Sequence, residues 1–232
     1  MTRRLVLVRH ARVDFASREF RQTPRGRQWD PPLGDEGRQQ AAQLAARLAS
    51  VDPPAALYVS PFRRCLETLS AYTERTGLTG GIVDDDLGEV FVGEWEGVPF
   101  EDLVAENEDF IRRRLHDHEA IFAQAPGAER GGELRARVVP AVERMLAESG
   151  DGDVLIVTHG GVINAYLGRL LGIGQDMFFL PENTSLNVVT VDGGEREVRF
   201  INDVAHLYMP ALWDGSADYT SPSRDAARPG TP

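Results

Sequence analysis

Two histidines and several arginines stand directly after three apolar runs of the chain. Arg9 and His10 follow the run at 5–8, Arg64 comes shortly after the run at 56–59, and His159 follows the run at 154–157. An imidazole nitrogen can act as a nucleophile, and guanidinium groups bind phosphate oxygens through paired N–H donors. If the three runs are parallel strands, their carboxyl ends meet at one edge of a sheet. The spacing therefore indicates a site for a negatively charged ligand at that edge.

The elements that must position these side chains follow from apolar periodicity. Helical spacing predicts helices at 36–50, 60–77, 134–149 and 161–171, with Ser60 as the N-cap of the second. Apolar, β-branched runs predict strands at 5–8, 56–59, 81–83, 154–157, 186–191 and 198–201. The arginine-rich segment at 9–33 reads as a polar loop. This alternation predicts a three-layer α/β sandwich with a mainly parallel central sheet, closed by an antiparallel hairpin.

The domain organisation is predicted to be simple. Residues 1–213 form one domain, and a charged helical stretch at about 98–130 is an excursion from the sheet. From 214 to 232 the composition turns to Ser, Asp, Ala, Pro and Gly, which predicts a tail without fixed structure.

Composition excludes several kinds of chemistry. All 25 basic residues are arginine, so neither a P-loop lysine nor a Schiff-base lysine is available. The single cysteine, Cys65, excludes a multi-cysteine metal site, and a net charge of −11 disfavours nucleic acid as a partner. No run of eighteen apolar residues and no signal peptide is present, so the expectation is a cytoplasmic protein without membrane contact. An apolar edge strand would permit a homodimer without requiring one.

The motifs taken together resemble those of the histidine phosphatase superfamily, also called phosphoglycerate-mutase-like. Arg9-His10-Ala11 resembles the family's Arg-His-Gly signature, and the segment from Ser60 to Thr68 resembles its second arginine motif. The segment around Glu89 resembles the acid-bearing motif. Further motifs of the family are matched by Leu33-Gly34, Gly131-Gly132-Glu133, Thr158-His159-Gly160-Gly161 and Asn202-Asp203 with His206-Leu207. The resemblance covers nearly the whole chain except the tail.

The resemblance implies a phosphoglycerate-mutase-like fold, with the helical insertion over the active site, and a metal-independent phosphatase without cofactor. In that reading His10 is the nucleophile that becomes phosphorylated, and Arg9 and Arg64 bind the phosphate. His159, protonated beside the phosphate, stabilises the transition state, and Glu89 is the proton donor. The backbone N–H at Gly160, where a helix begins, adds a donor to the same anion.

The substrate is expected to be a small phosphorylated metabolite of unknown identity. Ser17 and Arg21 are candidates for substrate binding, the second as a contact for another anionic group. Arg12 and Val13 depart from the family pattern, which weakens any substrate assignment. Two alternatives stay open: a mutase of the phosphoglycerate type with the same phosphohistidine chemistry, and a non-catalytic member that only binds a phosphorylated ligand.

Overall fold

A computed structural model of the chain describes residues 2–98, 102 and 125–208. The central sheet has six strands in the order β5-β4-β6-β1-β7-β8. The strands are β1 (Arg3–Arg9), β4 (Ala56–Val59), β5 (Ile82–Val83), β6 (Val154–Thr158), β7 (Leu186–Asp192) and β8 (Glu195–Asp203). β1, β4, β5 and β6 run parallel, and β7 and β8 are antiparallel at one side. The predicted α/β sandwich with its closing hairpin is therefore confirmed.

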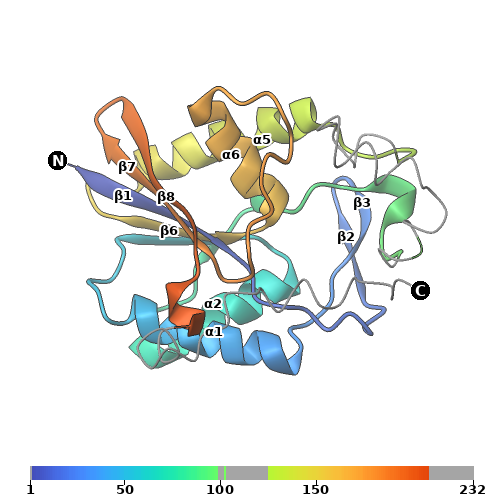
Figure 1. Cartoon of the computed structure of the whole chain (residues 1–232), viewed down its shortest axis with the longest axis horizontal. Coiled ribbons are helices and arrows are strands. Elements are labelled where there is room, and N and C mark those ends of the chain that lie inside the picture. Colours follow the sequence, from blue (N-terminus) through green and yellow to red (C-terminus); the bar gives the residue numbers. More distant parts are fainter. Residues whose placement is uncertain (1, 99–101, 103–124, 209–232) are drawn as a thin grey trace, which may run out of the picture.

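Helices cover both faces of this sheet (Figure 1). α1 (Asp35–Leu48) and α2 (Arg63–Thr76) lie on one face, and α5 (Gly131–Glu148) and α6 (Gly160–Leu171) on the other. Successive side chains of a strand point to opposite faces, so β1 contributes Leu5 and Leu7 to the core under α5 and α6, and Val8 to the core under α1 and α2. Two one-turn 3-10 helices, η1 (Asp85–Leu87) and η2 (Gly93–Trp95), connect β5 to the region before α5.

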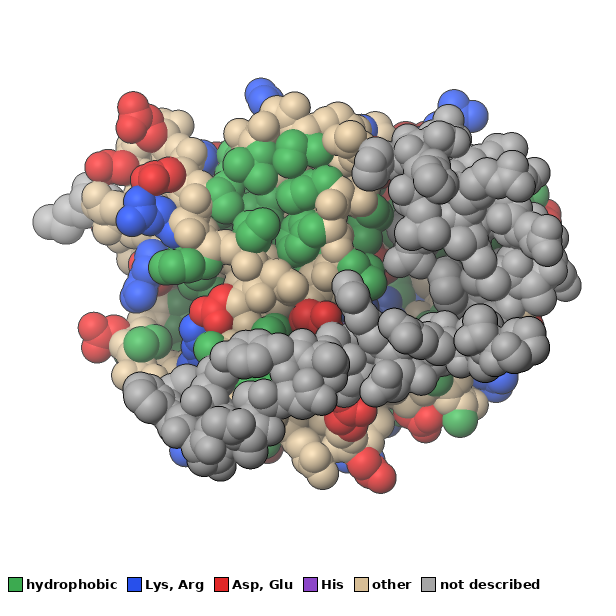
Figure 2. Space-filling view, viewed as in Figure 1, with side chains coloured by type: hydrophobic (Ala, Val, Ile, Leu, Met, Phe, Trp, Pro, Cys, Tyr) green, Lys and Arg blue, Asp and Glu red, His purple; other side chains and the backbone are tan. Residues whose placement is uncertain are grey.

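α6 is mostly apolar, and its first nine residues, Gly160 to Gly168, are all buried. Figure 2 shows apolar side chains gathered over this helix; its last residue, Leu171, is 47% exposed, and Leu180 beyond it is 59% exposed. Within the described ranges, no helix is both long and apolar enough to cross a membrane.

The prediction of a structureless loop at 9–33 is wrong in part. Two short strands, β2 (Phe20–Thr23) and β3 (Gly26–Trp29), form a separate antiparallel hairpin that stands away from the central sheet (Figure 1). Strands of four residues with mostly polar side chains carry little apolar alternation, so periodicity does not reveal them. The sequence feature that could have revealed the hairpin is the turn at Pro24-Arg25, followed by Gly26 at the start of β3.

The prediction of Ser60 as a helix N-cap is also wrong, because α2 begins at Arg63 with Phe62 as its N-cap and without a side-chain cap. Most of the predicted excursion at 98–130, and the whole predicted tail at 214–232, lie outside the described residues.

Candidate active site

Strand register brings the three predicted strand ends together. β1 pairs in parallel with β6 so that Val8 is opposite Val157 and Arg9 is opposite Thr158, and the N–H of His10 donates to the Thr158 carbonyl at 2.9 Å. β4 pairs with the other side of β6 and ends one residue before Ser60. Because the strands are parallel and nearly in step, the residues that follow them share one edge of the sheet.

His10 lies at this edge and is 7% exposed. Its Nδ1 is 2.8 Å from the carbonyl oxygen of Ala11. A carbonyl only accepts, so Nδ1 must carry the proton, which leaves the lone pair on Nε2. Burial, followed by the charges of Arg64 and Arg9, holds the pKa of His10 well below its ordinary value. The ring is therefore neutral at physiological pH, the state in which an imidazole is a nucleophile.

His159 is the N-cap residue of α6, and its ring centroid lies 5.2 Å from that of His10 at an interplanar angle of 63°. Its Nε2 is 2.7 Å from Ser60 Oγ and 3.4 Å from the sulfur of Cys65. Burial and then the charge of Arg64 hold the pKa of His159 well below its ordinary value. The protonated form expected from sequence therefore requires a bound anion, since the protein's own charges favour the neutral ring.

Of the two arginines predicted to bind phosphate, Arg64 is buried and Arg9 is half-buried. Burial lowers the pKa of Arg9, and its Nε is buried without a hydrogen-bond partner among the described residues. Its terminal nitrogen donates to the Pro181 carbonyl. A buried, unpaired guanidinium N–H is costly in a folded protein unless a ligand pairs with it. Arg9 is thus prepared to donate to an anion.

Arg64 is 6% exposed and donates to the Trp29 carbonyl at 3.1 Å. Its guanidinium carbon lies 4.5 Å from the centre of the Phe62 ring. The neighbouring Arg63 points to solvent and pairs with Glu19 and Glu67 at 2.7 and 2.6 Å. One step along a helix turns the side chain by about 100°, so only one of two adjacent arginines can face the site.

Glu89 lies at the start of α6, where its Oε1 accepts the N–H of Val90 at 3.0 Å and of Gly161 at 3.1 Å. A Cβ on Gly161 would be 2.5 Å from this oxygen, so the approach requires glycine. The backbone of Glu89 is held by Arg137, which donates to its carbonyl at 3.3 Å and forms a buried ion pair with Glu129. The N-terminus of α6 therefore fixes the carboxylate of Glu89, and Arg137 fixes its backbone.

Gly160 lies between these groups. A Cβ built on it would be 3.9 Å from Arg9 Nε, whereas the N–H of the next residue, Gly161, already serves Glu89. The backbone N–H of Gly161 is thus engaged by the Glu89 carboxylate, whereas Gly160 lies beside Arg9.

The two predicted substrate contacts differ in position. Ser17 belongs to a turn: its Oγ accepts the N–H of Glu19 at 3.2 Å, and its carbonyl accepts the indole N–H of Trp29 at 3.0 Å. Arg21, from β2, reaches the active-site edge, with its guanidinium carbon 5.2 Å from the centre of the Phe62 ring. Its Nε is buried without a hydrogen-bond partner among the described residues.

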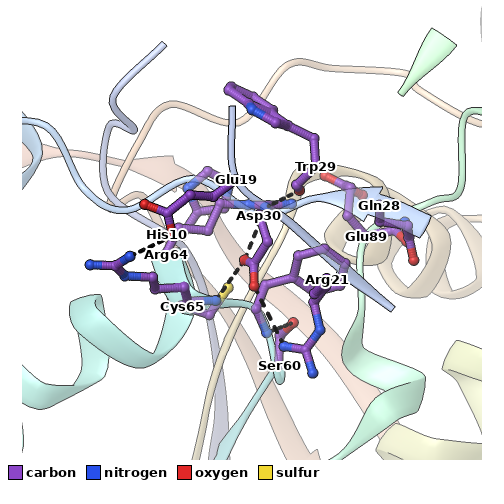
Figure 3. A network of polar contacts seen from close by, with 12 residues as sticks. His10, Glu19, Arg21, Gln28, Trp29, Asp30, Ser60, Arg64, Cys65 and Glu89 are labelled. Atoms are coloured by element: carbon purple, nitrogen blue, oxygen red, sulfur yellow. Dashed lines mark hydrogen bonds and ion pairs between the residues drawn. The ribbon is translucent and has the colours of Figure 1, made fainter. Parts of the chain in front are cut away.

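Asp30 joins the hairpin to the site and was not predicted from sequence. Its carboxylate lies 3.8 Å from Arg64 and 3.8 Å from Arg21, and accepts the N–H of Arg63 at 2.7 Å (Figure 3). Burial raises the pKa of Asp30, against the charges of the arginines. The sequence feature that could have drawn attention to Asp30 is its place directly before Pro31-Pro32, at the end of the hairpin. The contacts of Ser60 and Cys65 with His159 were also not predicted.

Comparisons with known proteins agree with this geometry. Residues 5–204 match the family model of the histidine phosphatase superfamily (branch 1). The chain is 31% identical over 196 residues to a glucosyl-3-phosphoglycerate phosphatase of Mycolicibacterium vanbaalenii, covering 75% of this chain and 76% of that protein. It is 28% identical over 207 residues to a bifunctional protein of Mycobacterium tuberculosis, covering 88% of this chain but only 55% of that protein. Among solved structures, YhfR of Bacillus stearothermophilus matches with a TM-score of 0.74 at 28% identity, over 88% of this chain and 99% of that one.

Proposed function

Since this chain belongs to the histidine phosphatase superfamily, branch 1, we propose that it hydrolyses a small phosphomonoester through a phosphohistidine on His10. The observation that carries the proposal is the meeting of two buried imidazoles, 5.2 Å apart, with the buried guanidinium of Arg64 and the half-buried guanidinium of Arg9 at one sheet edge. A phosphate ester with nearly two negative charges would be neutralised there by Arg9 and Arg64 without a metal ion.

In the first half of the reaction, Nε2 of His10 attacks phosphorus, and the bond between phosphorus and the ester oxygen breaks. Glu89 gives its proton to the departing alkoxide, which leaves as the alcohol. In the second half, a water molecule attacks phosphorus while the carboxylate of Glu89 accepts a proton from it. The bond between phosphorus and nitrogen then breaks, inorganic phosphate leaves, and His10 and Glu89 return to their starting protonation states.

His159 changes its role when an anion binds. A dianion beside its ring opposes the charges of Arg64 and Arg9 that lower its pKa, so binding favours uptake of a proton. The imidazolium then stabilises the charge that builds up on the phosphoryl oxygens in the transition state. Ser60, at 2.7 Å from Nε2, keeps the ring in place before and after that proton arrives.

The substrate is proposed to carry a second anionic group. Arg21 and Arg64 both lie 3.8 Å from the carboxylate of Asp30. Since Arg64 is proposed to bind the reacting phosphate, Arg21 lies close enough to contact another group of the same substrate. Its Nε is buried and has no hydrogen-bond partner in the part of the chain that the structure describes, so it can donate to a ligand. The similarity to a glucosyl-3-phosphoglycerate phosphatase agrees with a substrate that bears a carboxylate or a further phosphate.

The decisive experiment uses p-nitrophenyl phosphate, 3-phosphoglycerate and the His10→Ala variant. We expect the wild-type protein to release phosphate and to form an acid-labile phosphoenzyme, in buffer with or without EDTA, and the variant to do neither. Loss of activity in EDTA would refute the metal-independent mechanism. Conversion of 3-phosphoglycerate to 2-phosphoglycerate without phosphate release would identify a mutase. Equal, negligible hydrolysis by both proteins would identify a phospho-ligand-binding protein.

A further inference from the structure

The segment from Pro181 to Ser185 wraps the backbone at the end of β1. The N–H of Thr184 donates to the carbonyl of Arg9 at 3.0 Å, with a longer contact of 3.4 Å to the carbonyl of His10. The amide of Asn183 donates to the same His10 carbonyl at 2.9 Å. The carbonyl of Pro181 accepts from the Arg9 side chain. Three residues of one short segment therefore fix both the backbone of the nucleophile and the guanidinium next to it.

Thr184 occupies an unusual backbone conformation. Its φ is +59°, in the left-handed region that β-branched residues avoid, and its side chain is fully buried. Such a conformation is energetically unfavourable and persists only where surrounding contacts enforce it. This conformation directs the Thr184 N–H toward the carbonyls of Arg9 and His10, so the contacts that enforce it also bear on the nucleophile.

The hydroxyl of Thr184 has two partners that determine its direction. It donates its one proton to the Asn183 carbonyl at 2.7 Å, and its oxygen lies 3.0 Å from Nε2 of His206. The hydroxyl must therefore accept from His206, which places the imidazole proton on Nε2. On the other side of the ring, Arg47 of α1 lies 3.2 Å from Nδ1 and donates to it, which agrees with this tautomer.

The chain of contacts continues to the end of β8. Arg47 pairs with the carboxylate of Asp203, which also accepts the N–H of Ala205 at 3.0 Å. Burial and the charge of Arg47 lower the pKa of His206 to about 4, so the ring stays neutral and keeps one donor and one acceptor. The described contacts thus run without a gap from Asp203 through Arg47 and His206 to Thr184.

We infer that Thr184 and His206 are positioning residues for the nucleophile: they act through the Thr184 N–H on the backbone of His10 and touch no reacting atom. This inference rests on the proposed phosphohistidine function. The orientation of His10 depends on its own short contact from Nδ1 to the next backbone carbonyl, so a shift of this backbone turns Nε2 away from phosphorus. A displacement of about 1 Å in a reacting group lowers the rate by up to about 10²-fold.

The test compares variants that keep or remove one hydrogen bond. Thr184→Ser keeps the hydroxyl, and Thr184→Val keeps the shape but leaves the His206 donor unpaired. His206→Gln keeps a donor near Nε2, and His206→Phe removes it. Thr190→Val, the same change on β7 outside the network, is the control. The measurements are the rapid-quench rate of phosphoenzyme formation with p-nitrophenyl phosphate, the KM, and the inhibition constant of inorganic phosphate.

We expect Thr184→Val and His206→Phe to slow phosphoenzyme formation by about 10- to 100-fold, with KM and the phosphate inhibition constant changed less than threefold. Thr184→Ser, His206→Gln and the control should stay within about threefold of the wild-type rate. Phosphoenzyme formation at the wild-type rate in Thr184→Val and His206→Phe would overturn the inference. If the rate, the affinity for phosphate and the melting temperature all fell together in these variants, the role would be merely structural, and the inference would also be overturned.

If a valine or phenylalanine variant does not fold, the inference is judged on Thr184→Ser and His206→Gln, which retain the hydrogen bond and should form the phosphoenzyme within about threefold of the wild-type rate. A loss of more than about tenfold in these two bond-retaining variants would overturn it. A wild-type protein that forms no phosphoenzyme would refute the proposed function itself, which is a separate and earlier outcome.

Discussion

Replacing Gly161 by alanine should disable the proposed acid without touching it chemically. An ideal Cβ at this position would lie 2.5 Å from Glu89 Oε1, whereas ordinary contact begins near 3.4 Å. The difference, 3.4 minus 2.5, requires the carboxylate to move by about 0.9 Å, and the same Cβ would also meet Val90 at 3.4 Å. Since a misplacement of about 1 Å costs up to about 10²-fold, we expect kcat to fall by about that factor.

The helix itself should tolerate this change, because alanine favours helix by about 1 kcal/mol over glycine. Gly132→Ala is a matched control: Gly132 is also the second residue of a helix, and a Cβ there meets nothing within 4 Å. Gly132→Ala should therefore retain full activity. Melting temperatures of both variants near the wild-type value will show that the comparison is between folded proteins.

The assay measures kcat for an aryl phosphate and for an alkyl phosphate. An alkoxide leaves poorly without a proton, so Gly161→Ala should lose more activity toward the alkyl ester than toward p-nitrophenyl phosphate. A double-mutant cycle isolates the cause: in a Glu89→Ala background no carboxylate remains to be displaced, and Gly161→Ala should then have little further effect. Equal losses in both backgrounds would refute the assignment of Glu89 as the group that Gly161 accommodates.

The remaining predictions concern the arginines and the stability of the fold. Arg64→Met should lower kcat/KM by at least about 10²-fold while Arg63→Met, at an exposed ion pair, changes it less than about threefold; similar losses in both would remove Arg64 from the phosphate site. Arg21→Ala should raise KM for 3-phosphoglycerate by about tenfold and for p-nitrophenyl phosphate much less, and an unchanged KM for both would exclude a second anion contact. The pKa of His206, about 4 when folded against 6.5 ordinarily, makes the folded state the weaker proton binder, so stability is lost as pH falls from about 6.5 through 4. At ~1.4 kcal/mol per pKa unit, the wild-type free energy of unfolding should fall by ~3 kcal/mol between pH 7 and pH 4. Urea unfolding of His206→Gln, which lacks the imidazole, should show a smaller fall over the same range.

The architecture and the polar groups of the site's edge could be predicted from the sequence. Apolar runs of four or five residues, alternating with helices, specify a mainly parallel sheet, and parallel strands bring the residues after them to one edge. That reasoning places His10 and His159 together before any coordinates are known. The distinction between Arg63 and Arg64 came from a motif resemblance, and the structure supplies its physical basis: helix rotation buries one and exposes the other.

Only the tertiary structure decided which groups hold the reactive ones in place. The β2–β3 hairpin carries Asp30 to Arg64, and neither four-residue strand has enough apolar alternation to be seen in sequence. From local sequence Ser60 is predicted to cap a helix, yet its hydroxyl lies within hydrogen-bond distance of His159, 99 residues away. The link from His206 through Thr184 to the backbone of His10 likewise joins the two ends of the chain. Local sequence specifies periodicity and capping, whereas hydrogen bonds between distant residues depend on strand order and register, which exist only once the sheet has formed.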